Sequence, residues 1–136
     1  MSMRIFEAVK AENKKTLKLL RKLDDSASGT PDERRRLIAE IKLQFESLAE
    51  ATEEYLYPLF INEPTRYEAI VGRSQRREAE ELLYELERHH PSSKQFTRLA
   101  EVLSGQLRKQ IEHEERVLFP QGEKIISYED AEAMGE

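Results

Sequence analysis

Two copies of one short pattern constrain the fold of this chain more than any other feature of its sequence. The copies lie at residues 48–58 and 110–120, and each holds a pair of glutamates, then an apolar and aromatic turn, and then a proline. Proline removes a backbone hydrogen bond from a helix and kinks or ends it. Each copy therefore predicts a point near the end of a long helix where the chain is bent or stopped, at Pro58 and at Pro120.

Apolar residues recur every three or four positions over four stretches, which is the periodicity of amphipathic helices. The first predicted helix begins near Ser2, the fourth ends near Ile126, and the breaks lie near residues 24–30, 62–66 and 90–93. Short connections favour an all-α protein, an antiparallel up-down-up-down four-helix bundle with a short C-terminal helical turn. Residues 1–136 are expected to form this one domain, and no segment has the pattern of a strand.

Two of the helix starts carry capping signals. Thr30 is a predicted N-cap that forms a capping box with Glu33, and Ser92 is predicted to do the same with Gln95. The third helix is expected to stop at residues 89–91, where a proline follows two histidines. These signals place the boundaries of the second, third and fourth helices.

Each inward-facing stripe is apolar except near one level of the bundle. The predicted inward positions are Phe6, Val9, Asn13, Leu17 (or Thr16), Leu20 and Leu23 in the first helix; Leu37, Ile41, Phe45, Leu48, Thr52, Tyr55 and Leu59 in the second; Tyr67, Val71, Gln75, Ala79, Leu82 and Leu86 in the third; and Phe96, Leu99, Leu103, Leu107 (or Gln106), Gln110, Glu114 and Val117 in the fourth. The polar members can meet at one height, where bundles of this kind build metal and cofactor sites. The alternative is that some stripes are rotated by one residue, which would put these side chains at the boundary.

The repeated pattern resembles the motif of hemerythrin-like (HHE) domains, His-x-x-x-Glu-Glu followed by an aromatic residue and proline. Leu48 and Gln110 stand at the motif's histidine positions, and Glu12-Asn13 is similar to the family's Asp-His opening. The resemblance covers about residues 4–134 and implies a bundle with two oxygen-bridged irons at its centre. It also implies the family's functions, which are dioxygen binding, sensing of oxygen or iron, or handling of nitric oxide and peroxide.

Carried over one by one, the family's metal-ligand positions fall on residues that are mostly poor iron ligands. They are Asn13, Leu48, Thr52, Gln75, Gln110 and Glu114, with Ala79 where some members have a second histidine. Two irons need imidazole and carboxylate donors, and only Glu114 is a conventional ligand. We therefore expect no metal and no cofactor, with the amides and the Thr52 hydroxyl hydrogen-bonding one another and Glu114.

Other candidate sites have simpler interpretations. His113 adjoins Glu114, but successive helical residues point about 100° apart, so His113 is expected at the boundary. The histidines before Pro91 are explained by a cationic helix end, and the basic clusters at residues 34–36 and 73–77 are expected to be solvated. The glutamates that could form a surface site for a hard cation, also expected to be solvated, are Glu53, Glu54, Glu112 and Glu115.

Composition excludes several functional classes. The net charge of −5 argues against a general nucleic-acid binder, and the absence of cysteine excludes disulfides and thiolate sites. No window of 18 apolar residues and no leader pattern occurs, so we expect a soluble, cytoplasmic protein without a membrane partner. No nucleophile–base arrangement or phosphate loop is recognisable, so no catalytic residue is assigned and no enzymatic activity is expected.

Three functions are compatible with a family scaffold that has lost most of its ligands. The first is a protein-interaction, assembly or regulatory module that binds an unknown partner or associates with itself. The second is a small-molecule pocket in the vacated bundle centre. The third is a residual metalloprotein with one weakly held ion at Glu114, in which iron would still be the cofactor.

Overall fold

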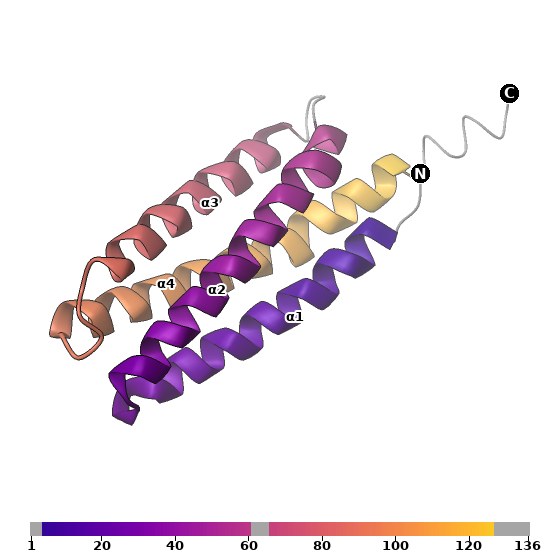
Figure 1. Cartoon of the computed structure of the whole chain (residues 1–136). Coiled ribbons are helices and arrows are strands. Elements are labelled where there is room, and N and C mark those ends of the chain that lie inside the picture. Colours follow the sequence, from indigo (N-terminus) through magenta and orange to yellow (C-terminus); the bar gives the residue numbers. More distant parts are fainter. Residues whose placement is uncertain (1–3, 61–65, 127–136) are drawn as a thin grey trace, which may run out of the picture.

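The computed structural model describes residues 4–60 and 66–126, and within these ranges the protein is helical and has no strand. Its long helices are α1 (Arg4–Asp24), α2 (Pro31–Ala51), α3 (Arg66–Glu87) and α4 (Lys94–His113). They pack as a bundle in which each helix runs opposite to the one before it (Figure 1). The predicted all-α four-helix fold is therefore confirmed, whereas the predicted cap at Ser2 and the predicted helical turn after Ile126 lie outside the described residues.

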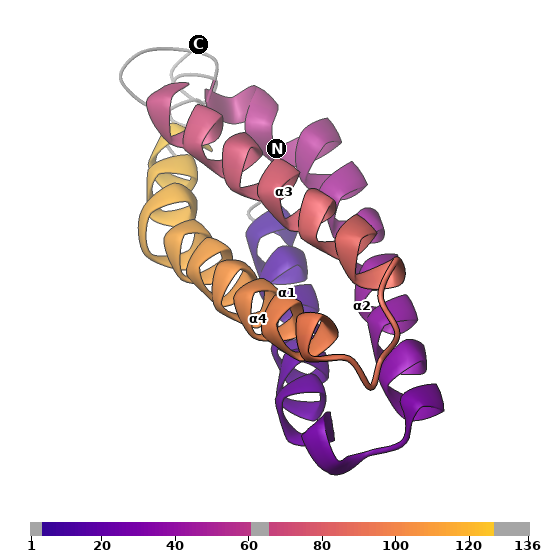
Figure 2. The same ribbon diagram turned by 90° about the vertical axis from the view of Figure 1, so that its left-hand side faces the viewer.

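Short helical elements of other kinds join or extend the long helices. A 3-10 turn, η1 (Asp25–Ser28), closes the connection from α1 to α2. A π-helical turn, η2 (Thr52–Leu56), extends α2 and leads into a 3-10 turn, η3 (Tyr57–Phe60). A second π-helical turn, η4 (Glu114–Leu118), extends α4, and the helix resumes over residues 119–126. Seen from the side, the four helices form one elongated bundle (Figure 2).

Both π-helical turns lie immediately before the prolines of the repeated pattern. The residue preceding Pro58 is Tyr57, whose N–H donates to the carbonyl of Thr52, five residues back. In the same way, Phe119 precedes Pro120 and donates to the carbonyl of Glu114. A proline cannot close an ordinary helical turn because it has no N–H, and a wider turn before it keeps the chain helical.

The extra residue in each π-helical turn changes which side chains face inward afterwards. Tyr55, predicted to face the core, is 56% exposed, and Leu56 is buried instead. In α4, Val117 is half-buried, while Leu118 and Phe119 are buried. The predictions at Tyr55 and Val117 were wrong because they continued an uninterrupted helical period, and one added residue rotates the remainder of the helix by about 100°.

The predicted inward stripe of the third helix was also wrong by about one residue in its first half, whereas Ala79 and Leu86 are buried as predicted. Tyr67 is 66% exposed and Gln75 is half-buried, whereas Gly72 and Arg76 are buried. The reason is the aromatic ring of Tyr57, which packs directly on Gly72: a Cβ built there would lie 2.9 Å from the Tyr57 hydroxyl. A glycine thus takes an inward position that hydrophobic periodicity would give to a large apolar residue.

The helix boundaries follow local hydrogen bonds. Thr30 is the N-cap of α2, as predicted, and its hydroxyl accepts from the Glu33 N–H at 3.2 Å. The cap of α4 is Ser93 and not Ser92, because the Ser93 hydroxyl accepts from the Phe96 N–H at 3.1 Å. The α3 helix ends at Glu87, slightly before the predicted stop.

The apolar core is divided into two clusters at opposite ends of the bundle. One cluster consists of Leu20, Leu23, Ile38, Ile41, Phe45, Ala79, Leu83, Leu86, Phe96, Ala100, Leu103 and Leu107. The other consists of Phe6, Val9, Leu56, Tyr57, Phe60, Ala69, Leu118, Phe119 and Ile126. Between them along the helices lie buried polar side chains, so the sequence-predicted polar layer separates two apolar halves. Among the described residues, no helix is long and apolar enough to cross a bilayer.

Candidate functional site: the polar layer

The polar layer contains six buried side chains from all four helices of the bundle. They are Asn13, Thr16, Thr52, Arg76, Gln110 and Glu114. Four of these were predicted as inward polar residues, and Thr16 was the stated alternative to Leu17. Arg76 was not predicted to be buried.

A small cavity lies within this layer. Its volume is about 20 Å³, and its lining residues are Asn13, Thr16, Phe45, Leu48, Arg76, Leu107, Gln110, Ile111 and Glu114. Asn13, Leu48, Gln110 and Glu114 are four of the six positions carried over from the family resemblance. The structure therefore brings together most of the predicted site.

Thr52 and Gln75 are the two predicted positions that do not line the cavity. Thr52 is fully buried, and its hydroxyl bonds within its own helix, to the carbonyls of Leu48 at 3.0 Å and Ala49 at 3.1 Å. Gln75 is half-buried, and its Oε1 atom has no hydrogen-bond partner among the described residues. The predicted network in which Thr52 supports Glu114 is therefore wrong, because local carbonyls satisfy the hydroxyl first.

Arg76 is the residue that sequence reasoning missed. It is 8% exposed, its Nη1 atom donates to the carbonyl of Ala49 at 3.1 Å, and its guanidinium lies 5.2 Å from the centre of the Tyr57 ring. It was assigned to a solvated basic cluster because it adjoins Arg77. A correct register for α3 would have found it, since Arg76 lies between the buried residues Gly72 and Ala79.

Glu114 is the one carboxylate of the cavity lining, and its environment favours the neutral form. Burial raises the pKa of Glu114 to about 7, although the nearby Arg76 charge acts in the opposite direction. The Oε2 atom of Glu114 has no hydrogen-bond partner among the described residues. Desolvation therefore outweighs the guanidinium, and the layer holds a carboxyl group that titrates near neutral pH.

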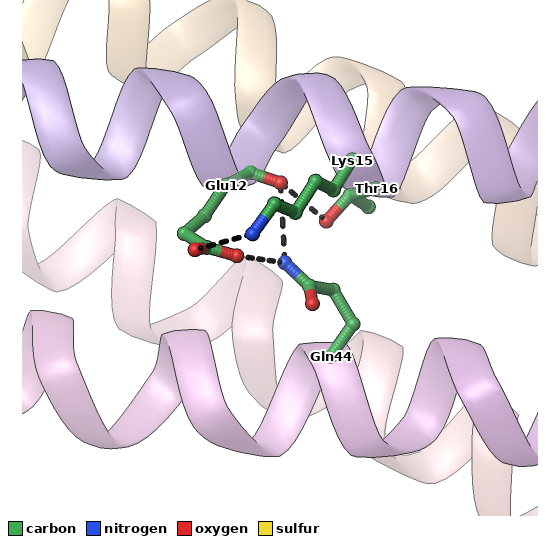
Figure 3. A network of polar contacts seen from close by, with 4 residues as sticks. All are labelled: Glu12, Lys15, Thr16 and Gln44. Atoms are coloured by element: carbon green, nitrogen blue, oxygen red, sulfur yellow. Dashed lines mark hydrogen bonds and ion pairs between the residues drawn. The ribbon is translucent and has the colours of Figure 1, made fainter.

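Glu12, next to Asn13 in the sequence, faces away from the cavity. Its carboxylate accepts from Gln44 of α2 at 2.7 Å and from Lys15 at 3.1 Å, and its carbonyl accepts from the Thr16 hydroxyl (Figure 3). These hydrogen bonds hold the pKa of Glu12 below its ordinary value. Glu12 thus links α1 to α2 beside the polar layer and is not available to a central ion.

The histidines lie outside the centre. His113 is at the seam between α3 and α4, where its Nε2 is 2.8 Å from Glu68 Oε2, so its predicted boundary position is confirmed. His90 accepts from the Ser92 N–H in the turn before α4. Across the described ranges, no three His, Cys, Asp or Glu side chains gather closely enough to hold a metal ion.

Arg34, like Arg76, was predicted to be solvated, but it is buried and contacts two other parts of the bundle. Only 5% of Arg34 is exposed. Its Nη1 atom donates to the carbonyl of Pro91 at 2.6 Å, and its guanidinium lies 4.7 Å from the centre of the Phe96 ring. Arg34 therefore fastens the start of α2 to the connection between α3 and α4.

A model of the hemerythrin HHE cation-binding domain matches residues 4–121. The chain belongs to this family. No curated protein and no solved structure gave a match. The family assignment agrees with the four-helix architecture and with the repeated pattern that ends in Pro58 and Pro120.

The residues at the centre of this hemerythrin HHE domain do not fit a pair of irons. Within the described ranges, the cavity lining offers one carboxylate, two amides and no imidazole. It also includes a guanidinium that carries a permanent positive charge, which repels a cation. Neutral amide oxygens are weak partners for iron compared with imidazole and carboxylate.

Proposed function

We propose that this hemerythrin HHE domain functions as a protein-binding module and not through iron at its centre. The observation that carries the proposal is the difference in volume between the central cavity and a groove on the surface of the bundle. The cavity in the polar layer measures about 20 Å³, whereas a groove on the outer face between α2 and α3 measures about 650 Å³. The bundle therefore has room for a binding partner on its surface and almost no room for a ligand at its centre.

The two alternative functions are weaker for physical reasons. Pockets that bind metabolites measure roughly 300–1,000 Å³, far more than the space beside Asn13 and Gln110. A single metal ion at Glu114 would lie in the same small layer as the charge of Arg76. Its one carboxylate would have to outweigh both that repulsion and the loss of hydration.

The outer groove has a mixed chemistry that favours a cationic partner. Its lining residues are Lys42, Phe45, Glu46, Arg77, Glu80, Glu81, Leu83, Tyr84, Glu85 and Glu87. Five of these are acidic and two are basic, and Glu80 and Glu81 form no ion pair with any described residue. Tyr84 is 63% exposed and provides an aromatic surface.

One ion pair lies within the groove. Lys42 bonds Glu87 at 2.8 Å, and both residues line the groove. The lining residues of α3 run from Arg77 to Glu87, which is about three helical turns. An amphipathic helix with basic residues along its flanks matches this length and charge, and docking of a helix into a groove is a common mode of recognition.

The first experiment tests the absence of iron. Protein purified from cells grown in iron-rich medium should be colourless, should lack oxo-bridge absorption, and should contain far less than one iron per chain. Near-stoichiometric iron that survives chelation would contradict the proposal and favour a metalloprotein.

The second experiment tests the groove, using a synthetic amphipathic helix of lysine and leucine as the probe. Amide chemical-shift changes should cluster on α2 and α3, and binding should weaken as salt is added. Glu81→Lys should weaken binding several-fold, and Glu101→Lys, which makes the same charge change on the exposed face of α4, should not. Equal weakening by both variants, or equal binding of a glutamate–leucine analogue, would contradict a specific groove. Concentration-dependent shifts without peptide would instead identify a second copy of the chain as the partner.

A further inference from the structure

Three buried polar atoms without partners point to a binding site in the centre of the bundle. They are Asn13 Nδ2, Gln110 Oε1 and Glu114 Oε2, and none has a hydrogen-bond partner in the part of the chain that the structure describes. All three residues are at least nine-tenths buried, and all three line the same cavity. Buried polar atoms of native proteins nearly always have partners, so three exceptions around one space indicate a common ligand.

The cavity limits the ligand to a very small molecule. A space needs roughly 10–15 Å³ to admit one water, and this one measures about 20 Å³. One water-sized molecule fits, and an organic ligand does not. Diatomic gases are of similar size, but they cannot satisfy an amide donor and two oxygen acceptors.

The lining also decides the charge of the ligand. A cation is disfavoured because Arg76 contributes a permanent positive charge to the same cavity. An anion is disfavoured because two of the three unpartnered atoms, Gln110 Oε1 and Glu114 Oε2, are oxygens. Glu114 Oε2 accepts a hydrogen bond in the carboxylate, and also in the neutral carboxyl group that carries its proton on Oε1. The ligand must then accept one hydrogen bond and donate two, and a neutral water does this with the usual number of about three bonds.

We infer that the cavity holds one ordered water molecule, which accepts from Asn13 Nδ2 and donates to Gln110 Oε1 and Glu114 Oε2. The water joins α1, which carries Asn13, to α4 and its extension η4, which carry the other two residues. It supplies a cross-link between these helices within the polar layer, whereas the direct side-chain bond of Arg108 to Asp24 joins them at the far end of α1. The water site is independent of the proposed surface function, because the groove between α2 and α3 shares only Phe45 with this cavity.

A crystal structure of the full chain at a resolution that shows ordered water is the direct test. We expect one density peak in the cavity at hydrogen-bond distances of about 2.7–3.2 Å from the three atoms. In solution, the side-chain amide protons of Asn13 should show cross-relaxation with a water that exchanges more slowly than the protein tumbles. Both measurements use the unmodified protein, so they do not depend on a variant folding.

A pair of matched variants separates this water from general hydration. Gln110→Leu replaces the amide with an apolar side chain of similar size and should remove both the peak and the cross-relaxation. Gln106→Leu makes the same change one turn earlier on α4, where the Gln106 amide bonds Glu78 at 2.8 Å on the surface, and should leave both signals unchanged. If Gln110→Leu does not fold, the unmodified protein still decides the matter.

Three results would overturn the inference. The cavity could be dry, with the amides of Asn13 and Gln110 bonded to each other. The peak could lie about 2.0–2.2 Å from its neighbours, which are metal–ligand distances and not hydrogen bonds. Finally, a bromide soak could place an anomalous signal in the cavity, which would make it an anion site.

Discussion

Arg76 of α3 and Glu114 of η4 bring opposite charges into one small cavity at the centre of the bundle. The charge of Arg76 lowers the pKa of Glu114, but burial raises it by a larger amount, so that the pKa is about 7. No hydrogen bond joins the two side chains among the described contacts, and Arg76 donates instead to the carbonyl of Ala49. The guanidinium therefore offsets only part of the cost of burying the carboxylate.

Replacing Glu114 with glutamine should stabilise the protein at neutral pH and above. A pKa of about 7 exceeds the ordinary value of 4.5, so between these values the native state holds a proton that the unfolded chain has released. Stability from this group thus falls as pH rises from about 4.5 to 7 and is constant beyond. At about 1.4 kcal/mol per pKa unit, the penalty above pH 7 is on the order of 3 kcal/mol, and Glu114→Gln removes much of it. Urea unfolding at pH 5 and pH 8 measures the difference.

Glu101→Gln provides the control for the Glu114 prediction. Glu101 is exposed on α4, so its substitution removes one carboxylate without removing a buried charge. The free energy of unfolding of this variant should follow that of the unmodified protein at both pH values. A clear loss of stability in Glu114→Gln at pH 8 would show instead that the carboxylate is ionised and well bonded in the native state.

Replacing Arg76 with methionine should destabilise the protein, and the cost should depend on Glu114. The change removes the hydrogen bond to Ala49 and the positive charge near the carboxyl, with an expected loss of about 1–3 kcal/mol. At pH 8, where Glu114 is mostly ionised, Arg76→Met should cost less in the Glu114→Gln background, with a coupling of at least about 0.5 kcal/mol. Arg77→Met, on an exposed neighbouring residue, is the control. Additive effects of the two central substitutions would rule out the charge interaction.

Gly72→Ala should destabilise the protein through its contact with Tyr57. A Cβ at residue 72 would lie 2.9 Å from the Tyr57 hydroxyl oxygen and 3.2 Å from its Cε1 atom. The ring cannot move easily, because it is buried and the guanidiniums of Arg73 and Arg76 lie 5.1 and 5.2 Å from its centre. Overpacking of this kind costs about 1–3 kcal/mol, measurable by thermal or urea unfolding.

Two further variants test the cause of the Gly72 effect. Adding Tyr57→Phe to Gly72→Ala removes the closest atom and should recover part of the stability. Gly105→Ala lies on the exposed side of α4, where an added Cβ would meet nothing within 4 Å. It should stabilise the helix by up to about 1 kcal/mol, because alanine is the better helix former. A stabilised Gly72→Ala variant would mean that Tyr57 does not press on α3.

The sequence could predict those features that depend on local chemistry. The cap at Thr30 and the stripe of α1 with Asn13 at its centre were recognised correctly, because capping residues and an uninterrupted helical period are both visible in the sequence. The polar layer was also predictable, since Gln110 and Glu114 interrupt an otherwise apolar stripe.

Other features could not be predicted because distant contacts decide them. The π-helical turns before Pro58 and Pro120 shift the helical period, and nothing in a periodicity argument marks that shift. The choice of Arg76 over Gln75 as the inward residue of α3 depends on the ring of Tyr57, which comes from another helix. Helical spacing had favoured Gln75, because it lies four residues from both Val71 and Ala79.

The position of Arg76 also changes how an iron site could be rebuilt. The sequence alone would place histidine at Gln75, but Gln75 is only half-buried and does not line the cavity, whereas Arg76 is buried and lines it. We therefore expect iron binding from a variant that removes the guanidinium and supplies imidazoles and a second carboxylate around Glu114. Its substitutions are Asn13→His, Leu48→His, Thr52→Glu, Arg76→His and Gln110→His.

A matched variant isolates the contribution of Arg76. It keeps Arg76, carries Gln75→His in its place, and is otherwise identical, so that it holds the same number of new histidines. Added ferrous ion should raise the melting temperature of the first variant through linkage of binding to folding, and the metal content should approach the family's two irons per chain. The variant that retains Arg76 should show neither effect, because its guanidinium remains in the space that the cations must occupy. Equal iron binding by both would show that Arg76 can leave the centre, and that the loss of imidazole and carboxylate ligands alone accounts for any lack of metal in this protein.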